Sequence, residues 1–146
     1  MKRMITLRGV SECGKSTKVK QLAEWIINNY SHTNLGVNIT NGDINGVLII
    51  GKVKIGFNSA GDDFECVSGN DSLIINYPDI DILINTSRTK GITRRHLEFH
   101  YNESNGWLVH NIFVNKLIPS NTVLENQRDR YIMDKLISLI TGLDKI

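Results

Sequence analysis

The chain contains 146 residues, of which 40% are hydrophobic and 22% are charged. This composition excludes collagen-like, mucin-like and highly charged disordered chains, and the length predicts a single domain over residues 1–146. Lys and Arg number 17 against 15 Asp and Glu, so the net charge of +2 does not by itself indicate nucleic-acid binding. We expect no membrane span and no signal peptide. Two cysteines are too few for a disulfide framework, which favours a cytoplasmic protein.

The first half of the chain is expected to form a strand, a helix and a β-hairpin. Residues 4–7 are apolar and β-branched, which is typical of a strand. Between residues 15 and 30 the apolar side chains recur at helical spacing, which predicts a helix with one buried face. Residues 47–50 and 53–57 are strand-like runs separated by two residues that begin with Gly51, and this arrangement is typical of a tight hairpin.

The middle of the chain predicts a helix, a strand and a further ambiguous segment. A helix is expected within residues 63–77, interrupted at the three turn-forming residues 69–71. Residues 80–85 form an apolar run that predicts a buried strand. Residues 93–104 favour a helix capped by Thr93, although the alternation of apolar and polar residues there leaves a strand open.

The last third predicts a strand over residues 108–114 and a helix over residues 122–143. Thr122 and Glu125 have the spacing of a capping box. The apolar stripe of this helix completes the core or contributes to a homodimer; its members are Ile132, Leu136, Leu139, Ile140 and Leu143. Strands that alternate with helices predict an α/β fold, with a mostly parallel sheet and helices on its faces.

Residues 9–17 match the pattern G-x-x-x-x-G-K-[ST] of a phosphate-binding loop, between a predicted strand and a predicted helix. Glycines at both ends permit backbone angles and close approaches that a Cβ would block. Successive N–H groups and the positive end of the helix dipole then favour an anion. In such a loop Lys15 reaches the β- and γ-phosphates, and the Ser16 hydroxyl ligates Mg²⁺. The candidate ATP-binding residues are Gly9, Ser11, Glu12, Cys13, Gly14, Lys15, Ser16 and Thr17.

A magnesium site in such a protein also needs a carboxylate. Asp62 follows the second hairpin strand, and ligands gather at the carboxyl ends of parallel strands. We therefore expect Asp62 to hold Mg²⁺ with Ser16, or to orient an acceptor hydroxyl, while Asp63 caps the next helix. Asp43 is a weaker candidate, because its neighbours favour a turn.

A group of cations follows the strand predicted over residues 80–85. Arg88, Lys90, Arg94 and Arg95 lie within eight residues. Arginine stabilises the charge that spreads over a transferring phosphoryl group, so Arg88 and Arg94 are candidate catalytic residues. The alternative is a basic turn exposed to solvent, which is what most runs of charge form.

Taken with the phosphate-binding loop, residues 55–63 and 86–91 give the chain a resemblance to the small kinase-like P-loop ATPases of bacteriophages and some bacteria. The resemblance implies a P-loop NTPase fold, a three-layer α-β-α sandwich that uses ATP and Mg²⁺ and is broadly related to nucleoside and nucleotide kinases. A viral member would act in the host cytoplasm. The chain lacks the long lid insertion of nucleoside monophosphate kinases.

Two functions follow from these residues. The first is transfer of the γ-phosphoryl group of ATP to a nucleoside, a nucleotide or a nucleic acid. In it, Lys15 and Ser16 would act with Asp62, Arg88 and Arg94 mainly by positioning and electrostatics. The second is a nucleotide-binding switch or ATPase that acts on a protein partner, as in phage assembly or interference with the host. Dependence of phosphate transfer on an acceptor separates the two.

Overall fold

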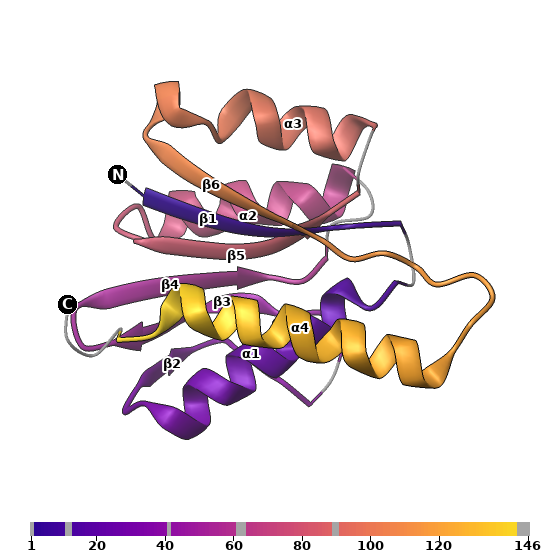
Figure 1. Ribbon diagram of the computed structural model, residues 1–146. Helices are drawn as coiled ribbons and strands as arrows, with labels where there is room; N and C mark the ends of the chain where they lie inside the picture. Colours follow the sequence, from indigo (N-terminus) through magenta and orange to yellow (C-terminus); the bar gives the residue numbers. More distant parts are fainter. Residues whose placement is uncertain (1, 11–12, 41, 61–63, 89–90, 143–146) are drawn as a thin grey trace.

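The computed structural model describes residues 2–10, 13–40, 42–60, 64–88 and 91–142. Helices and strands alternate over most of this length (Figure 1). Their bounds are β1 (Lys2–Arg8), α1 (Lys15–Asn29), β2 (Thr33–Leu35), β3 (Asn45–Ile50), β4 (Val53–Asn58), α2 (Phe64–Asn76), β5 (Ile82–Ser87), α3 (Ile92–His100), η1 (Glu103–Asn105), β6 (Trp107–Phe113) and α4 (Thr122–Ile140).

The strands of the described residues form one sheet in the order β2-β3-β4-β5-β1-β6. β1 runs parallel to β5 and β6, and β4 runs parallel to β5. β3 pairs antiparallel with both β2 and β4, so the sheet is mixed rather than wholly parallel. The expected α/β class is confirmed, and the carboxyl ends of β4, β5, β1 and β6 meet at one edge of the sheet.

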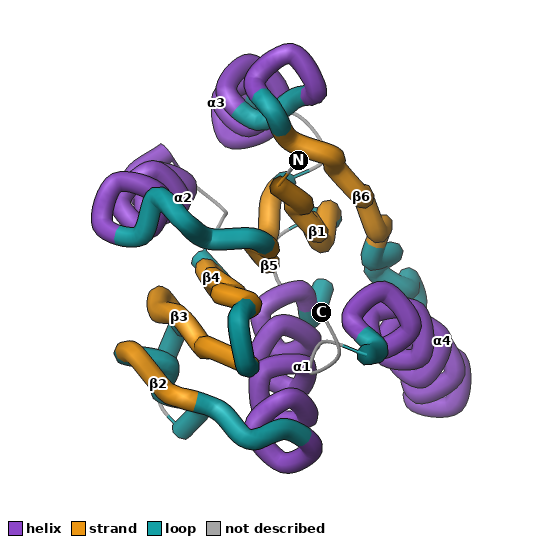
Figure 2. Tube along the Cα trace, turned by 90° about the vertical axis from the view of Figure 1, so that its left-hand side faces the viewer, coloured by secondary structure: helices purple, strands orange, loops and turns teal. Residues whose placement is uncertain are grey.

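Helices cover both faces of the sheet: α1 and α4 lie on one face, and α2 and α3 lie on the other (Figure 2). Alternate residues of β1 therefore belong to different cores, with Ile5 and Leu7 facing α1 and α4 and Met4 facing α2 and α3. The α4 stripe is buried at Ile132, Leu136 and Ile140 in the first of these cores. This part of the stripe completes the core, as one of the two sequence interpretations predicted; Leu143 lies outside the described residues.

The expected interruption of α2 at residues 69–71 is wrong, because the helix continues through them. Each of the three residues has a tertiary role that outweighs its turn preference. A Cβ on Gly69 would lie 2.9 Å from Asn45 Nδ2, so glycine allows the helix to approach the sheet closely. Asn70 Oδ1 accepts from Asn58 and Asn85, both at 3.3 Å. Asp71 connects the helix to α3.

The link through Asp71 is a pair of hydrogen bonds from α3 and the residue after it. Tyr101 donates its hydroxyl to Asp71 Oδ1 at 2.6 Å, and His96 Nε2 lies 2.9 Å from Asp71 Oδ2. Burial, and then Asp71, raise the pKa of the Tyr101 hydroxyl above its ordinary value, so tyrosine stays a donor. These contacts hold α3 against α2.

Two predicted helix caps are wrong by one or two residues. The structure resolves the ambiguity over residues 93–104 in favour of helix, but α3 ends at His100 and the separate turn η1 follows over Glu103–Asn105. Helix α3 begins after Gly91 rather than at a Thr93 cap. Helix α4 is capped by Asn121, whose side chain accepts from Leu124 N at 3.1 Å. Thr122 is instead the first residue of the helix. Asparagine is at least as good a cap as threonine, so the neighbour takes the position.

Candidate functional site

The loop from Gly9 to Gly14 joins the carboxyl end of β1 to the start of α1. Gly9 N donates to Ser87 O at 3.1 Å, which connects the loop to the end of β5. A Cβ on Gly9 would lie 2.6 Å from both Cys13 Sγ and Val114 O, closer than nonbonded atoms approach. Gly14 has a φ of +99°, in the region that favours glycine. The backbone path therefore requires glycine at both positions.

Lys15 and Ser16, the first residues of α1, lie against the loop and the edge of the sheet. The Lys15 side chain is only 4% exposed, and its Nζ donates to Gly9 O at 2.6 Å. Ser16 Oγ donates to Ser59 O at 2.9 Å, and Thr86 Oγ1 donates to the same oxygen at 2.9 Å. A buried ammonium beside the first N–H groups of a helix is an arrangement that attracts anions.

Ser59 also connects the carboxylate of Asp43 to this edge of the sheet. Its Oγ donates to Asp43 Oδ1 at 3.1 Å and accepts from Ile44 N at 2.7 Å. Asp43 is therefore connected through Ser59 to the Ser16 hydroxyl. The sequence placed Asp43 in a turn and ranked it below Asp62 as a metal ligand; the structure brings Asp43 to the end of β4.

Other predicted site residues lie outside the described residues: Ser11, Glu12, Asp62, Asp63 and Lys90. Their roles stay predictions. Within the described ranges, no group of three or more His, Cys, Asp or Glu side chains is arranged to hold a metal ion.

The arginines that follow β5 differ in their surroundings. Arg88 is exposed and directly follows Ser87, whose carbonyl oxygen accepts a hydrogen bond from Gly9 N. Arg94, in the first turns of α3, forms an ion pair with Glu98 in which Nε and Oε1 are 2.7 Å apart. Arg95 is exposed. The structure therefore brings Arg88 next to the loop and pairs Arg94 with a carboxylate of its own helix.

The remaining described loop positions also differ in exposure. Cys13 is 3% exposed and packs in the core beneath α1, whereas Thr17 is exposed on the first turn of that helix. The Cys13 thiol is therefore a packing group that lies directly under the loop.

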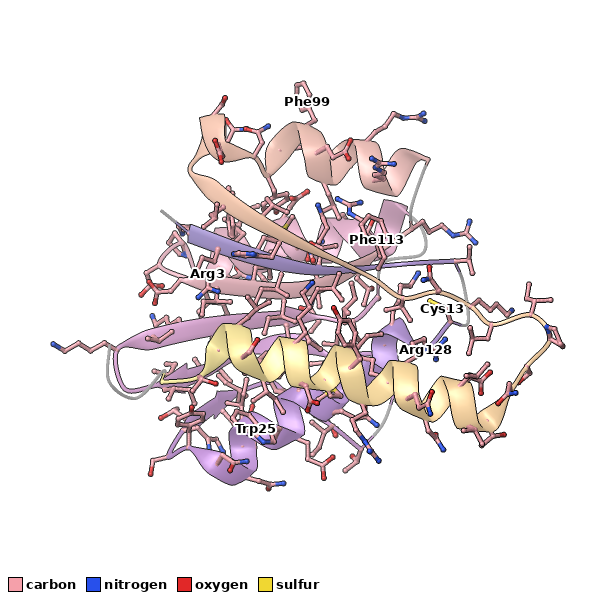
Figure 3. The ribbon with its side chains drawn as sticks, in the orientation of Figure 1. Arg3, Cys13, Trp25, Phe99, Phe113 and Arg128 are labelled. Atoms are coloured by element: carbon pink, nitrogen blue, oxygen red, sulfur yellow. The ribbon has the colours of Figure 1, made fainter. Side chains whose placement is uncertain are left out.

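A charged cluster that sequence analysis missed connects α1 to α4. Lys18 is 3% exposed, and its Nζ lies 3.2 Å from Asp129 Oδ2. Arg128 donates to Asp129 Oδ1 from Nε at 3.1 Å and from Nη2 at 3.0 Å, and it also donates to Asn115 O. Its Nη2 lies 3.7 Å from the position of a Cβ on Gly14. Helix α4 thus places a guanidinium group beside the start of α1, close to the labelled Cys13 (Figure 3).

A cavity of 230 Å³ opens beside Gly9, and we call it the loop cavity. Its walls come from the end of β1, the start of the loop that follows it, and the end of β6 with the segment after it. They consist of Arg8, Gly9, Val10, Phe113, Val114, Asn115, Lys116 and Ile118. Because pockets for whole small molecules are typically larger, about 300–1,000 Å³, this cavity suits one part of a ligand.

Arg8, which sequence analysis also missed, is buried at the end of β1, immediately before the loop. It is 3% exposed, and its Nε donates to Asn111 Oδ1 at 2.7 Å while Nη1 donates to Ser87 Oγ at 3.4 Å. Burial lowers the pKa of the guanidinium, with Glu98 acting in the opposite direction. No short-range pattern reveals this residue, because its partners lie on β5 and β6.

No protein-family model, curated protein or solved structure matches this chain. Among the described residues, no helix has the length and apolar character needed to cross a membrane.

Proposed function

We propose that this chain is a kinase-like P-loop NTPase that transfers the γ-phosphoryl group of ATP to a nucleoside, nucleotide or nucleic-acid acceptor. The observation that carries the proposal is the loop between β1 and α1. It combines glycine at two positions where a side chain is strained or excluded with the buried Lys15 ammonium across the loop. This combination suits the phosphates of a nucleotide.

The residues of this chain would act mainly by positioning charge. Lys15 would bind the β- and γ-phosphate oxygens, exchanging its bond to Gly9 O for bonds to phosphate. Ser16 would contribute its hydroxyl to Mg²⁺, with Asp62 as the expected carboxylate. Held by these residues, Mg²⁺ would neutralise part of the negative charge of the phosphates. Arg88, with Arg94, would stabilise the transferring group.

The experiment is incubation with Mg²⁺ and ATP labelled at the γ-phosphate, with and without nucleosides, nucleotides and DNA ends. Lys15→Ala removes the ammonium at the loop. Lys52→Ala is the matched control, because Lys52 is exposed in the turn between β3 and β4. This turn comes before β4, so it lies at the opposite edge of the sheet from the loop that follows β1. A thermal melt of each variant checks that it is folded.

Each result has a distinct meaning. Label on an acceptor, lost with Lys15→Ala but kept with Lys52→Ala, supports the kinase and names its acceptor class. Label released only as inorganic phosphate favours the alternative of an ATPase or switch that acts on a protein partner. Failure of the wild-type protein to bind ATP or ADP overturns both functions.

A further inference from the structure

Arg8 carries a buried charge whose hydrogen-bond partners, among the described residues, are neutral groups. The guanidinium donates to an amide oxygen of Asn111 and to the hydroxyl of Ser87. Among the described residues, no carboxylate forms an ion pair with it. Glu98 is near enough to affect its pKa, but that carboxylate is bonded to Arg94. A buried cation without a counter-charge is costly, so its position favours a site for an anion.

A second cavity lies along β6 beneath α3, and we call it the α3 cavity. Its volume is 340 Å³, within the range of about 300–1,000 Å³ that is typical of small-molecule sites. Its lining includes Arg8, Glu98, Glu103, Trp107 and Asn111. Arg8 lies at the carboxyl end of β1, while Glu103 and Trp107 lie where β6 begins. The α3 cavity is therefore cationic at the end next to the loop and carries carboxylates elsewhere.

Arg8 also joins this cavity to the phosphate-binding loop. It lines both the α3 cavity and the loop cavity, and it immediately precedes Gly9. A ligand whose anionic group reaches Arg8 from the α3 side would thus lie next to the loop that we propose holds ATP.

We propose that the α3 cavity binds a small acceptor whose phosphate or carboxylate group pairs with Arg8. The inference rests on the proposed function and narrows its acceptor to an anionic molecule. The planar guanidinium offers paired donors that match both anions. The carboxylates of Glu98 and Glu103 accept hydrogen bonds, so they suit hydroxyl or amino groups on the rest of the molecule. An uncharged nucleoside has no anionic group to pair with the guanidinium of Arg8.

Trp107 provides a direct readout of occupancy. The chain has two tryptophans, so Trp25→Phe leaves Trp107, in the wall of the α3 cavity, as the sole indole fluorophore. In this background, with saturating MgADP to fill the loop, we would titrate ribose 5-phosphate, gluconate, inorganic phosphate and uncharged ribose. We expect a saturable change in emission with the anions and none with ribose. The relative responses distinguish a phosphate ligand from a carboxylate ligand.

Variants of Arg8 separate anion binding from a purely structural role. Arg8→Gln should weaken anion binding roughly 10- to 100-fold, because a charged hydrogen-bond donor is lost. Arg3→Gln is the matched control: Arg3 lies on the same strand and its guanidinium donates to Leu139 O at 3.0 Å on the other face. Glu98→Gln should strengthen anion binding, because it removes a negative charge from the cavity.

The stability of Arg8→Met completes the test. Methionine keeps an unbranched side chain and removes the buried charge, so the thermal unfolding midpoint without ligand should stay unchanged or rise. A marked fall in the midpoint, together with unchanged anion binding in Arg8→Gln, would show that Arg8 is structural. MgADP binding without any anion-dependent change at Trp107 overturns this inference alone. Absence of MgADP binding in a separate calorimetric titration overturns the proposed function instead.

Discussion

Asp129 connects two cations on the face of the sheet that α1 and α4 cover: Lys18 on α1 and Arg128 on α4. We expect Asp129→Asn to lower the free energy of unfolding, because it leaves the Lys18 ammonium, only 3% exposed, without its carboxylate. Breaking a fully buried pair costs about 3–5 kcal/mol. Asp129 is 32% exposed, so water reaches the site and the expected loss falls to about 2–3 kcal/mol. For a chain of this length that is a decrease of roughly 5–10 °C in Tm.

The matched variant is Lys18→Met, and the comparison is the sensitive part of the test. This change removes the buried charge itself, while Asp129 keeps its two hydrogen bonds from Arg128 and its contact with water. We therefore expect Lys18→Met to stay within about 1 kcal/mol of the wild-type protein.

Urea denaturation followed by circular dichroism would measure both variants, and equal m-values would show that the unfolded states are comparable. If Lys18→Met lost as much stability as Asp129→Asn, the argument from unequal burial of the two charges would fail.

Three further changes test other parts of the structure. Gly9→Ala should abolish ADP binding in a calorimetric titration, because its Cβ would meet a backbone carbonyl at 2.6 Å; affinity within tenfold of wild type would contradict the assigned loop geometry. Asn121→Ala should cost about 1 kcal/mol in urea denaturation through loss of the α4 cap, and no change would assign the cap elsewhere. Burial, and then the charges of Arg3 and Lys135, lower the pKa of His110 in the folded protein. This group therefore contributes stability above its unfolded pKa of about 6.5, and that stability is lost as the pH falls through the folded pKa. The stability of His110→Gln should therefore depend less on pH than that of the wild type between about pH 7.5 and 5, and parallel curves would refute this.

The sequence was sufficient for elements whose pattern is local. Apolar spacing over residues 15–30 predicted α1, and the two runs around Gly51 predicted the β3–β4 hairpin. Both signals depend on residues a few positions apart, which is the range over which a helix or hairpin is specified. The short strand β2 gave no such signal, because its three residues are largely exposed and pair with β3 through the backbone.

Tertiary contacts decided the features that the sequence could not reveal. Gly69 and Asn70 have strong turn preferences, yet close packing on the sheet and hydrogen bonds to strand residues keep them helical. The loop glycines were recognisable because the pattern over residues 9–17 places glycine at the two positions where the backbone requires it. Arg8 and the partners of Lys18 were not, since each meets side chains that are distant in the sequence.

The order of the strands also sets when the loop between β1 and α1 can be completed during synthesis. β1 and the loop leave the ribosome before β5, β6 and α4, yet β1 pairs with β5 and β6, and Lys18 pairs with Asp129 on α4. Synthesis must therefore extend through α4 before the loop has all these supports, and such long-range closure slows folding. Nucleotide affinity should be gained only by nascent chains from which α4 has emerged. The state of the loop between β1 and α1 can thus report that α4 has folded.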